Sequence, residues 1–195
     1  MHTLEQQYPE NYFSLLGLPI SFDIDKDLLI KNYHEIQKSI HPDNFANAGD
    51  RERRLSVQKA AQINDALNSL KNPLPRAIYL LSLFAIELSE NKHVAPEFLM
   101  EQMELREALS QVNDKADPFA ELDVLINDVN TRIKHSISQL SRLFECLLAT
   151  ETGSEQDNKQ QEQLELITAE VLKMQYLNRL QEECLNKEED LAEQY

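Results

Sequence analysis

Residues 31–43 read KNYHEIQKSIHPD, and this stretch decides how the first part of the chain folds. Pro42 lacks an amide hydrogen and disfavours helical geometry at His41, so a helix that enters this stretch should end there. The sequence therefore predicts an amphipathic helix that leads to a rigid turn displaying His41 and Asp43. Its apolar face is formed by Leu29, Tyr33, Ile36 and Ile40, which recur at intervals of three and four residues.

The segments on either side of this helix also predict helices. Asp25 can cap the helix before the turn, and Asp50 can cap one after it. A shorter apolar turn or helix is expected at residues 12–18, where Gly17 ends it and Pro19 blocks its continuation. The two longer helices should form an antiparallel hairpin, in which the second helix packs through Leu55, Ala60, Ile63, Leu67 and Leu70.

A cationic stripe lies on the helix before the turn. Lys31, His34 and Lys38 are spaced by three and four residues, so they share a face that is distinct from the apolar one. The simplest interpretation is a solvated surface, because Asp27 and Glu35 can pair with the two lysines along the helix. The other interpretation is a surface that attracts an acidic partner to the turn.

The turn itself has three possible meanings. A tripeptide of this kind can arise by chance, and a histidine beside an aspartate can also act as a base and its orienting group. We find no nucleophile motif, glycine-rich phosphate loop or metal cluster to accompany His41 and Asp43, so docking is favoured over a hydrolase. In a docking turn Pro42 would reduce the entropy lost on binding.

The composition narrows the class of protein. Only 3 of the 195 residues are glycine, and Leu, Glu, Gln and Ala abound, which favours an all-α fold. The net charge of −15 disfavours nucleic acid and anionic membranes as general partners. The apolar stretch at residues 77–88 is too short to span a bilayer, and residues 1–7 show no export signal, so we expect a cytoplasmic protein.

The two cysteines do not predict a metal site. Cys146 and Cys184 lie far apart without a CxxC pattern or a nearby histidine. We expect both to be small core residues of a reduced protein, with no cofactor or iron–sulfur cluster bound.

Two prolines indicate a domain boundary. Pro73 and Pro75 interrupt the helical pattern, so we predict one domain at residues 1–75 and a helical bundle at residues 76–195. The first holds 8 basic and 10 acidic side chains, whereas the second holds 11 and 24. The expected bundle helices run from Pro96 to about Val112, from Asp117-Pro118 to about Leu148, and from Leu164 to about Leu185, with a polar loop at residues 150–163.

The first bundle helix has two apolar faces. Phe98, Leu105, Leu109 and Val112 share one side, which suffices for a core. Another helix could cover the second face, or the face could bind a partner through an apolar centre with a charged rim. That second face consists of Leu99, Met100 and Met103, bordered by Glu104 and Glu107.

The first domain resembles a J-domain. The resemblance rests on the turn His41-Pro42-Asp43 and on its surroundings. It implies that the turn, approached through Lys31, His34 and Lys38, engages a DnaK-type chaperone and stimulates its ATP hydrolysis, so that the chemistry occurs in the partner. The surrounding pattern comprises Tyr12, Leu15, Leu16 and Gly17, then Lys31 and Lys38, and after the turn Ile63, Ala66, Leu67 and Leu70.

Two further stretches carry a more specific resemblance, residues 76–83 (RAIYLLSL) and 98–107 (FLMEQMELRE). Together with the J-domain pattern, they make nearly the whole chain resemble the HscB family of J-type co-chaperones of iron–sulfur cluster assembly. This resemblance implies that the chaperone is HscA and that the second apolar face of the bundle binds the cluster scaffold IscU. A J-domain co-chaperone for a different client of DnaK is the alternative. The scaffold-binding residues would be Leu99, Met100, Met103, Glu104, Glu107 and Tyr176, while Gln111 stands where an acidic residue is expected.

Overall fold

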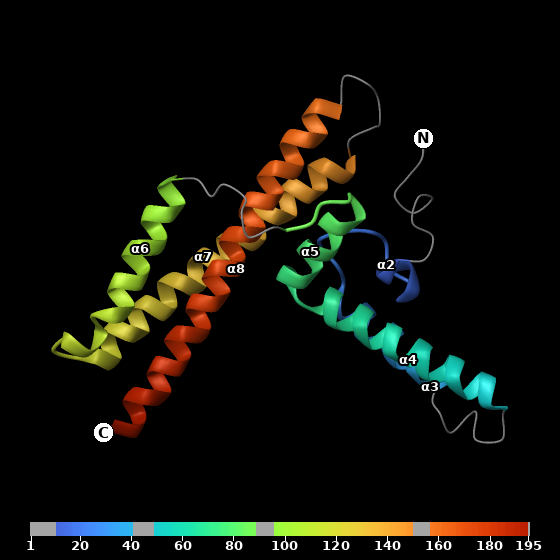
Figure 1. Cartoon of the computed structure of the whole chain (residues 1–195), viewed down its shortest axis with the longest axis horizontal. Coiled ribbons are helices and arrows are strands. Elements are labelled where there is room, and N and C mark those ends of the chain that lie inside the picture. The colour runs from blue at the N-terminus through green and yellow to red at the C-terminus, as the bar shows by residue number, and fades with distance from the viewer. Residues whose placement is uncertain (1–10, 41–48, 89–95, 150–156, 195) are drawn as a thin grey trace. The chain divides into compact units, whose positions relative to one another are not determined.

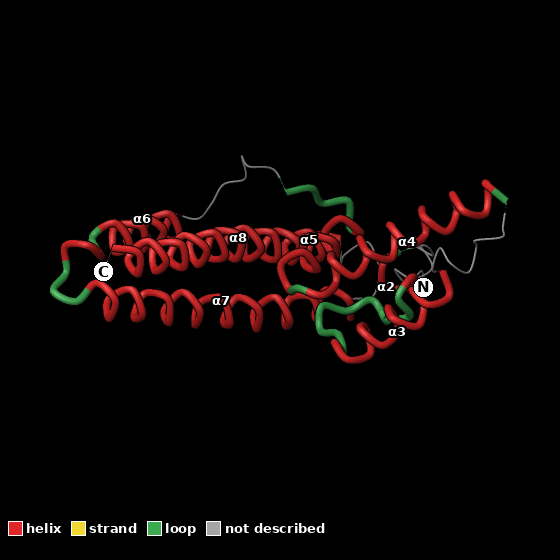
Figure 2. The backbone as a smooth tube through the Cα atoms, turned by 90° about the horizontal axis from the view of Figure 1, so that it is seen from below, coloured by secondary structure: helices red, strands yellow, loops and turns green. Residues whose placement is uncertain are grey.

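The computed structural model describes residues 11–40, 49–88, 96–149 and 157–194. Within these ranges the chain is helical and contains no strand, which confirms the all-α fold (Figure 2). The chain divides into two compact units. The first comprises Met1–Glu87 and Phe144–Gln161, and the second comprises Leu88–Leu143 and Glu162–Tyr195.

The first unit begins with the short helix α2, Tyr12–Leu15. Asn11 caps it by accepting a hydrogen bond from the Ser14 amide at 2.9 Å, and the Ser14 hydroxyl accepts one in return from the Asn11 amide. The helix ends, as predicted, before Gly17, which adopts a left-handed conformation with φ of 65°. Asn32 then donates to the carbonyl oxygen of Leu16 at 2.8 Å, so this turn is tied to the next helix.

Helices α3, Lys26–Ile40, and α4, Asp50–Lys71, pack against each other in the first unit (Figure 1). The predicted cap at Asp25 is confirmed, because its carboxylate accepts hydrogen bonds from the amides of Asp27 and Leu28. The predicted cap at Asp50 is wrong by one residue. Gly49 holds the extended N-cap conformation, and Asp50 is the first helical residue, where its charge still favours the helix N-terminus.

Helix α5, Pro73–Leu83, follows α4 with only Asn72 between them. Pro73 occupies the first helical position, where its missing amide costs nothing. The backbone amide of Tyr12 donates to the Tyr79 hydroxyl at 2.8 Å, and the two rings stack at 4.4 Å. Helix α5 therefore packs within the first unit, which extends beyond residue 75.

A buried arginine and two aromatic rings complete the first unit. Arg76 donates to the carbonyl oxygen of Leu70 at 2.8 Å and lies 5.1 Å from the centre of the Phe22 ring. Burial lowers its pKa, and the nearby carboxylate of Asp23 opposes that effect. Phe22 also stacks on Phe144 at 5.4 Å, so the end of a distant helix contributes to this core.

The second unit is formed by α6, Pro96–Ser110, the short 3₁₀ helix η2, Val112–Asp114, and most of two long helices. These are α7, Pro118–Ala149, and α8, Asp157–Gln194, and both views show α6 running alongside them (Figures 1 and 2). Asp117 caps α7 as predicted, since its carboxylate accepts a hydrogen bond from the Ala120 amide at 3.0 Å. The core includes Leu122, Val129, Leu177, Leu180 and Cys184.

The predicted bounds of the last helix and the predicted burial of Cys146 are wrong. Helix α8 ends at Gln194 rather than at about Leu185. Helix α8 already begins at Asp157, because residues 157–163 are polar but rich in good helix formers and continue directly into the buried Leu164. Cys146 is exposed rather than buried, since it lies on the outer side of α7, whereas Cys184 is fully buried as expected. Burial raises the pKa of the Cys184 thiol to about 11.

Candidate partner-binding surfaces

The predicted chaperone-binding turn, His41-Pro42-Asp43, lies outside the described residues. Helix α3, which leads to it, is described as far as Ile40. Lys31, His34 and Lys38 are all exposed on α3, as a stripe requires, and the His34 ring lies 5.4 Å from the ring of Tyr33. The structure therefore shows an accessible cationic stripe.

Helix α6 presents one buried and one exposed apolar face. Phe98 and Leu105 are buried, and so is Val112 of η2, as predicted for the core side, whereas Leu109 is only partly buried against the same core. On the opposite side Leu99, Met100 and Met103 have 54%, 65% and 66% of their surfaces exposed. No described segment of the chain covers this second face, so the bundle does not use it for its own packing.

Glu104 and Glu107 border the exposed apolar residues, and both are exposed. The side-chain amide of Gln111 donates to the Glu107 carboxylate at 2.9 Å. Gln111 is thus a neutral hydrogen-bond donor at a position where an acid is expected, and it orients Glu107 without cancelling its charge. The exposed face of α6, defined by Leu99, Met100, Met103, Glu104 and Glu107, is called the α6 patch below.

Tyr176 of α8 lies against the side of α6. Its hydroxyl donates to the carbonyl oxygen of Gln102 at 2.8 Å, and its ring meets that of Phe98 edge-on at 5.7 Å. Arg106 lies over the other part of the ring, 5.9 Å from its centre. Burial raises the pKa of Tyr176, while the hydrogen bond and charge of Arg106 lower it. The residue is half-buried beside the α6 patch, between core and solvent.

Sequence reasoning missed an ionic clamp that holds α6 in place. The Glu101 carboxylate pairs with Arg132 of α7 and lies 3.7 Å from the ammonium nitrogen of Lys173 of α8. Arg132 also binds Asp128 at 2.8 Å. Burial lowers the pKa of Arg132, but its hydrogen bonds and ion pairs with these two carboxylates outweigh that effect and raise it.

The clamp could not be found in the sequence, because its partners lie 31 and 72 residues from Glu101 along the chain and no local spacing connects them. A third ion pair joins the same helices, between Arg106 and Glu183 at 2.9 Å. Together with the Tyr176 bond, these contacts fix the rotation of α6 about its axis. They thereby determine which side chains reach solvent.

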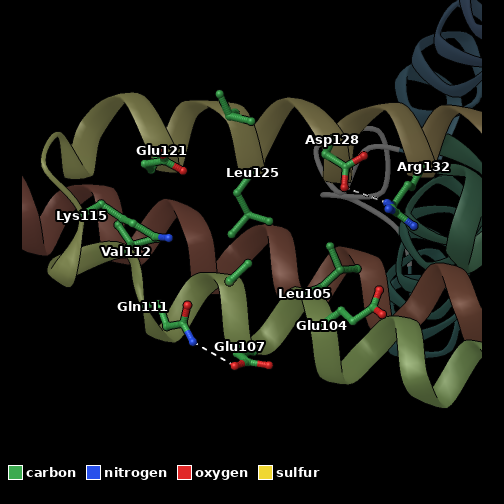
Figure 3. Close-up of a pocket in the computed structure, with 12 residues that line it drawn as sticks. Glu104, Leu105, Glu107, Gln111, Val112, Lys115, Glu121, Leu125, Asp128 and Arg132 are labelled. Carbon is green, nitrogen blue, oxygen red and sulfur yellow. Dashed lines mark hydrogen bonds and ion pairs between the residues drawn. The ribbon is translucent and has the colours of Figure 1, made fainter.

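A pocket of about 460 Å³ opens between α6, η2 and α7 (Figure 3). Leu105 and Val112 from the first two elements and Leu125 from α7 form its apolar floor, and all three are buried. Glu104 and Glu107 belong both to this pocket and to the α6 patch. The two features therefore form one continuous surface.

The described ranges contain neither a cluster of metal ligands nor a membrane-spanning helix. They contain no group of three or more histidine, cysteine or acidic side chains arranged to hold a metal ion. No helix in the described part of the chain combines the length and apolar character needed to cross a membrane.

Comparison with known proteins agrees with the pattern in the sequence. Residues 94–184 match the family described as the HSCB C-terminal oligomerisation domain. A co-chaperone protein HscB homolog from Shewanella pealeana is 38% identical over 185 residues, which are 94% of this chain and 99% of that protein. One from Vibrio cholerae is 51% identical over 132 residues, or 67% of this chain and 77% of that protein.

Solved structures give the same result. Chaperone HscB from Vibrio cholerae has a TM-score of 0.77 at 40% identity and covers 93% of this chain and 99% of its own. Human co-chaperone protein HscB has a TM-score of 0.78 at 28% identity over 92% of this chain and 82% of its own. The chain therefore belongs to the HscB family of co-chaperones.

Proposed function

We propose that this co-chaperone serves iron–sulfur cluster assembly in the cytoplasm by binding the scaffold protein IscU and delivering it to the DnaK-type chaperone HscA. A J-domain at residues 1–75 stimulates ATP hydrolysis by HscA, and the bundle at residues 76–195 holds the scaffold. The protein performs no chemistry of its own and needs no cofactor. The observation that carries this proposal is the exposed apolar face of α6 at Leu99, Met100 and Met103.

The α6 patch has the composition of a protein-binding site. Three large apolar side chains stand more than half exposed, and fully burying one such side chain contributes about 1.5–3 kcal/mol. Methionine adapts its shape to a partner surface, which suits Met100 and Met103 to this role. The charged rim at Glu104 and Glu107 favours one orientation of the partner. Tyr176 supports the patch by holding α6 and offers part of its own ring beside it.

The chaperone-binding end is proposed to be the turn His41-Pro42-Asp43, approached along the cationic stripe of α3. The exposed Lys31, His34 and Lys38 would attract an acidic surface of the chaperone. This attraction should weaken with added salt, because exposed charges are screened over about 8 Å at physiological ionic strength.

The decisive experiment measures HscA ATPase activity as this protein is titrated, with and without IscU. We expect stimulation by the protein and synergy with the scaffold. His41→Gln should abolish stimulation while sparing scaffold binding, and Leu99→Ala with Met103→Ala should do the reverse. Equal loss of both functions in either folded variant contradicts the division of labour.

The same experiment distinguishes the alternative client. Calorimetry of the full chain with IscU should show binding that the double variant weakens. If IscU does not bind while DnaK is still stimulated, the protein serves a different client. Substrate turnover in the absence of any chaperone, abolished by His41→Ala, would instead indicate a hydrolase.

A further inference from the structure

The pocket between α6 and α7 contains an apolar side chain that the bundle does not bury. Val124 of α7 lines the pocket with 67% of its surface exposed. Leu105 and Leu125 lie on the floor and are buried. The lining thus includes apolar side chains of both helices, buried at Leu105 and Leu125 and exposed at Val124. We call this feature the α6–α7 groove.

The charges around the groove are predominantly negative. Glu104, Glu107, Glu121 and Asp128 line it together with Lys115 and Arg132, so four carboxylates face two cations and leave a net charge of −2.

The interactions of these carboxylates show which of them can receive a partner. Asp128 is neutralised by Arg132 at 2.8 Å, and Glu107 accepts the Gln111 amide. Neither Glu104 nor Glu121 forms an ion pair with another described residue. These two carboxylates lie on different helices and at different ends of the groove: Glu104 on α6 toward Asp128 and Arg132, and Glu121 on α7 near η2 (Figure 3).

We propose that the α6–α7 groove is a second part of the scaffold-binding site and receives a lysine or arginine of the scaffold together with an adjoining apolar side chain. The cation would lie beside Glu121, and the apolar group would contact Val124, which is one helical turn away on the same wall. This inference rests on the proposed function, because the groove shares Glu104 and Glu107 with the α6 patch. A partner seated on that patch is thereby brought to the groove.

The test uses substitutions at exposed positions of the full-length chain. Glu121→Lys reverses the charge of one wall, and Val124→Ser removes the apolar rim. Asp123→Lys is the matched control, because it makes the same charge change one residue before Val124. Asp123 is exposed and does not line the groove, since helical geometry points it to the opposite side of α7 from Asp128 and Arg132. Circular dichroism confirms that each variant is folded.

Binding of purified IscU is measured by biolayer interferometry at two salt concentrations. We expect Glu121→Lys to weaken the Kd about threefold to tenfold at low salt, mainly through slower association, and less at high salt. Val124→Ser should weaken it by roughly fourfold at both salt concentrations, through faster dissociation. Asp123→Lys should remain within about twofold of the wild type at high salt.

Failure of the inference can be separated from failure of the proposed function. If Leu99→Ala with Met103→Ala weakens binding while both groove variants behave like Asp123→Lys, the groove is not part of the site and the proposed function stands. If the wild type does not bind IscU, the proposed function fails first. If sedimentation shows self-association that Val124→Ser abolishes while IscU binding is unchanged, a second copy occupies the groove and the inference is overturned.

Discussion

The hydroxyl of Tyr176 donates to the main-chain carbonyl oxygen of Gln102 across 2.8 Å, which joins the middle of α8 to the middle of α6. Gln102 directly precedes Met103 of the α6 patch. Tyr176 therefore supports the α6 patch indirectly, because its hydrogen bond holds α6, the helix that carries the patch. A partner meets an α6 that is already oriented, so less conformational freedom is lost on binding.

Tyr176→Phe should remove this hydrogen bond and keep the edge-on contact with Phe98. We expect the free energy of unfolding to fall by about 1 kcal/mol, and the Kd for IscU to rise by no more than about threefold. Urea unfolding and calorimetry measure the two effects. A loss of binding above about tenfold in a variant of wild-type stability would show instead that the hydroxyl contacts the scaffold directly.

Glu101→Gln should destabilise the bundle, because it replaces the carboxylate shared by Arg132 and Lys173. We expect a loss of about 1 kcal/mol, since the pair is only partly buried and solvent screens it. Glu104→Gln is the matched control on the same helix, and its stability should stay within about 0.5 kcal/mol of the wild type. A double-mutant cycle with Arg132→Met isolates the pair, and a coupling energy of zero would refute the clamp.

Gly17→Ala should destabilise the first unit by about 1 kcal/mol or more, because the left-handed conformation at φ of 65° disfavours a side chain. The added Cβ would also lie 3.2 Å from the Asn32 nitrogen that binds Leu16. Thermal unfolding measures this loss.

Gly49→Ser is the control in the same thermal unfolding experiment, because it adds a side chain at a glycine whose backbone does not disfavour one. The backbone at Gly49 is extended, and an added Cβ meets nothing within 4 Å. A serine at this N-cap can bind a free amide of α4, so we expect stability to rise by a few tenths of a kcal/mol. Equal destabilisation by both substitutions would contradict the conformational explanation.

The two thiols should react at very different rates. Cys146 is exposed, whereas Cys184 is fully buried and has a raised pKa of about 11. At pH 8 we expect one thiol to react with a disulfide reagent at least about tenfold faster than the other, and the slow one to react only on unfolding. Cys146→Ser should remove the fast phase, and a persisting fast phase would contradict the assignment.

The same pKa shift predicts how stability changes with pH. The folded state holds the Cys184 proton up to about pH 11, whereas the unfolded thiol loses it near 9. The folded protein therefore binds more protons between these values, and stability should fall as the pH rises from 9 to 11. Cys184→Ala should remove this part of the pH dependence in urea unfolding at pH 8 and pH 10.

Two helix caps and the core side of one helix, which depend on neighbours in the sequence, were predicted correctly, whereas Leu55, predicted to pack in the hairpin, is exposed. The caps at Asp25 and Asp117 follow from side chains that reach amides two or three residues away. The buried side of α6 follows from helical periodicity alone. The error at Asp50 has a local cause too, since an acidic residue suits both the cap and the first turn, and only backbone geometry separates the two.

Features that depend on tertiary contacts could not be predicted. The clamp at Glu101, the buried Arg76 and the α6–α7 groove all require the positions of helices that are distant along the chain. The same limit applies to Cys146, because its place on the outer side of α7 depends on which side of that helix the core takes. Neither helical periodicity nor the packing of the helices identifies the partner that the protein binds.

The stacking of Phe22 on Phe144 has a consequence for the order of events at the ribosome. Phe22 leaves the exit tunnel early, while its partner ring has yet to be synthesised at the far end of α7. Arg76 can contact the Phe22 ring once α5 has been made, but the contact with Phe144 forms only after most of the chain has emerged. Completion of the first unit is a late event in translation, although its sequence comes first.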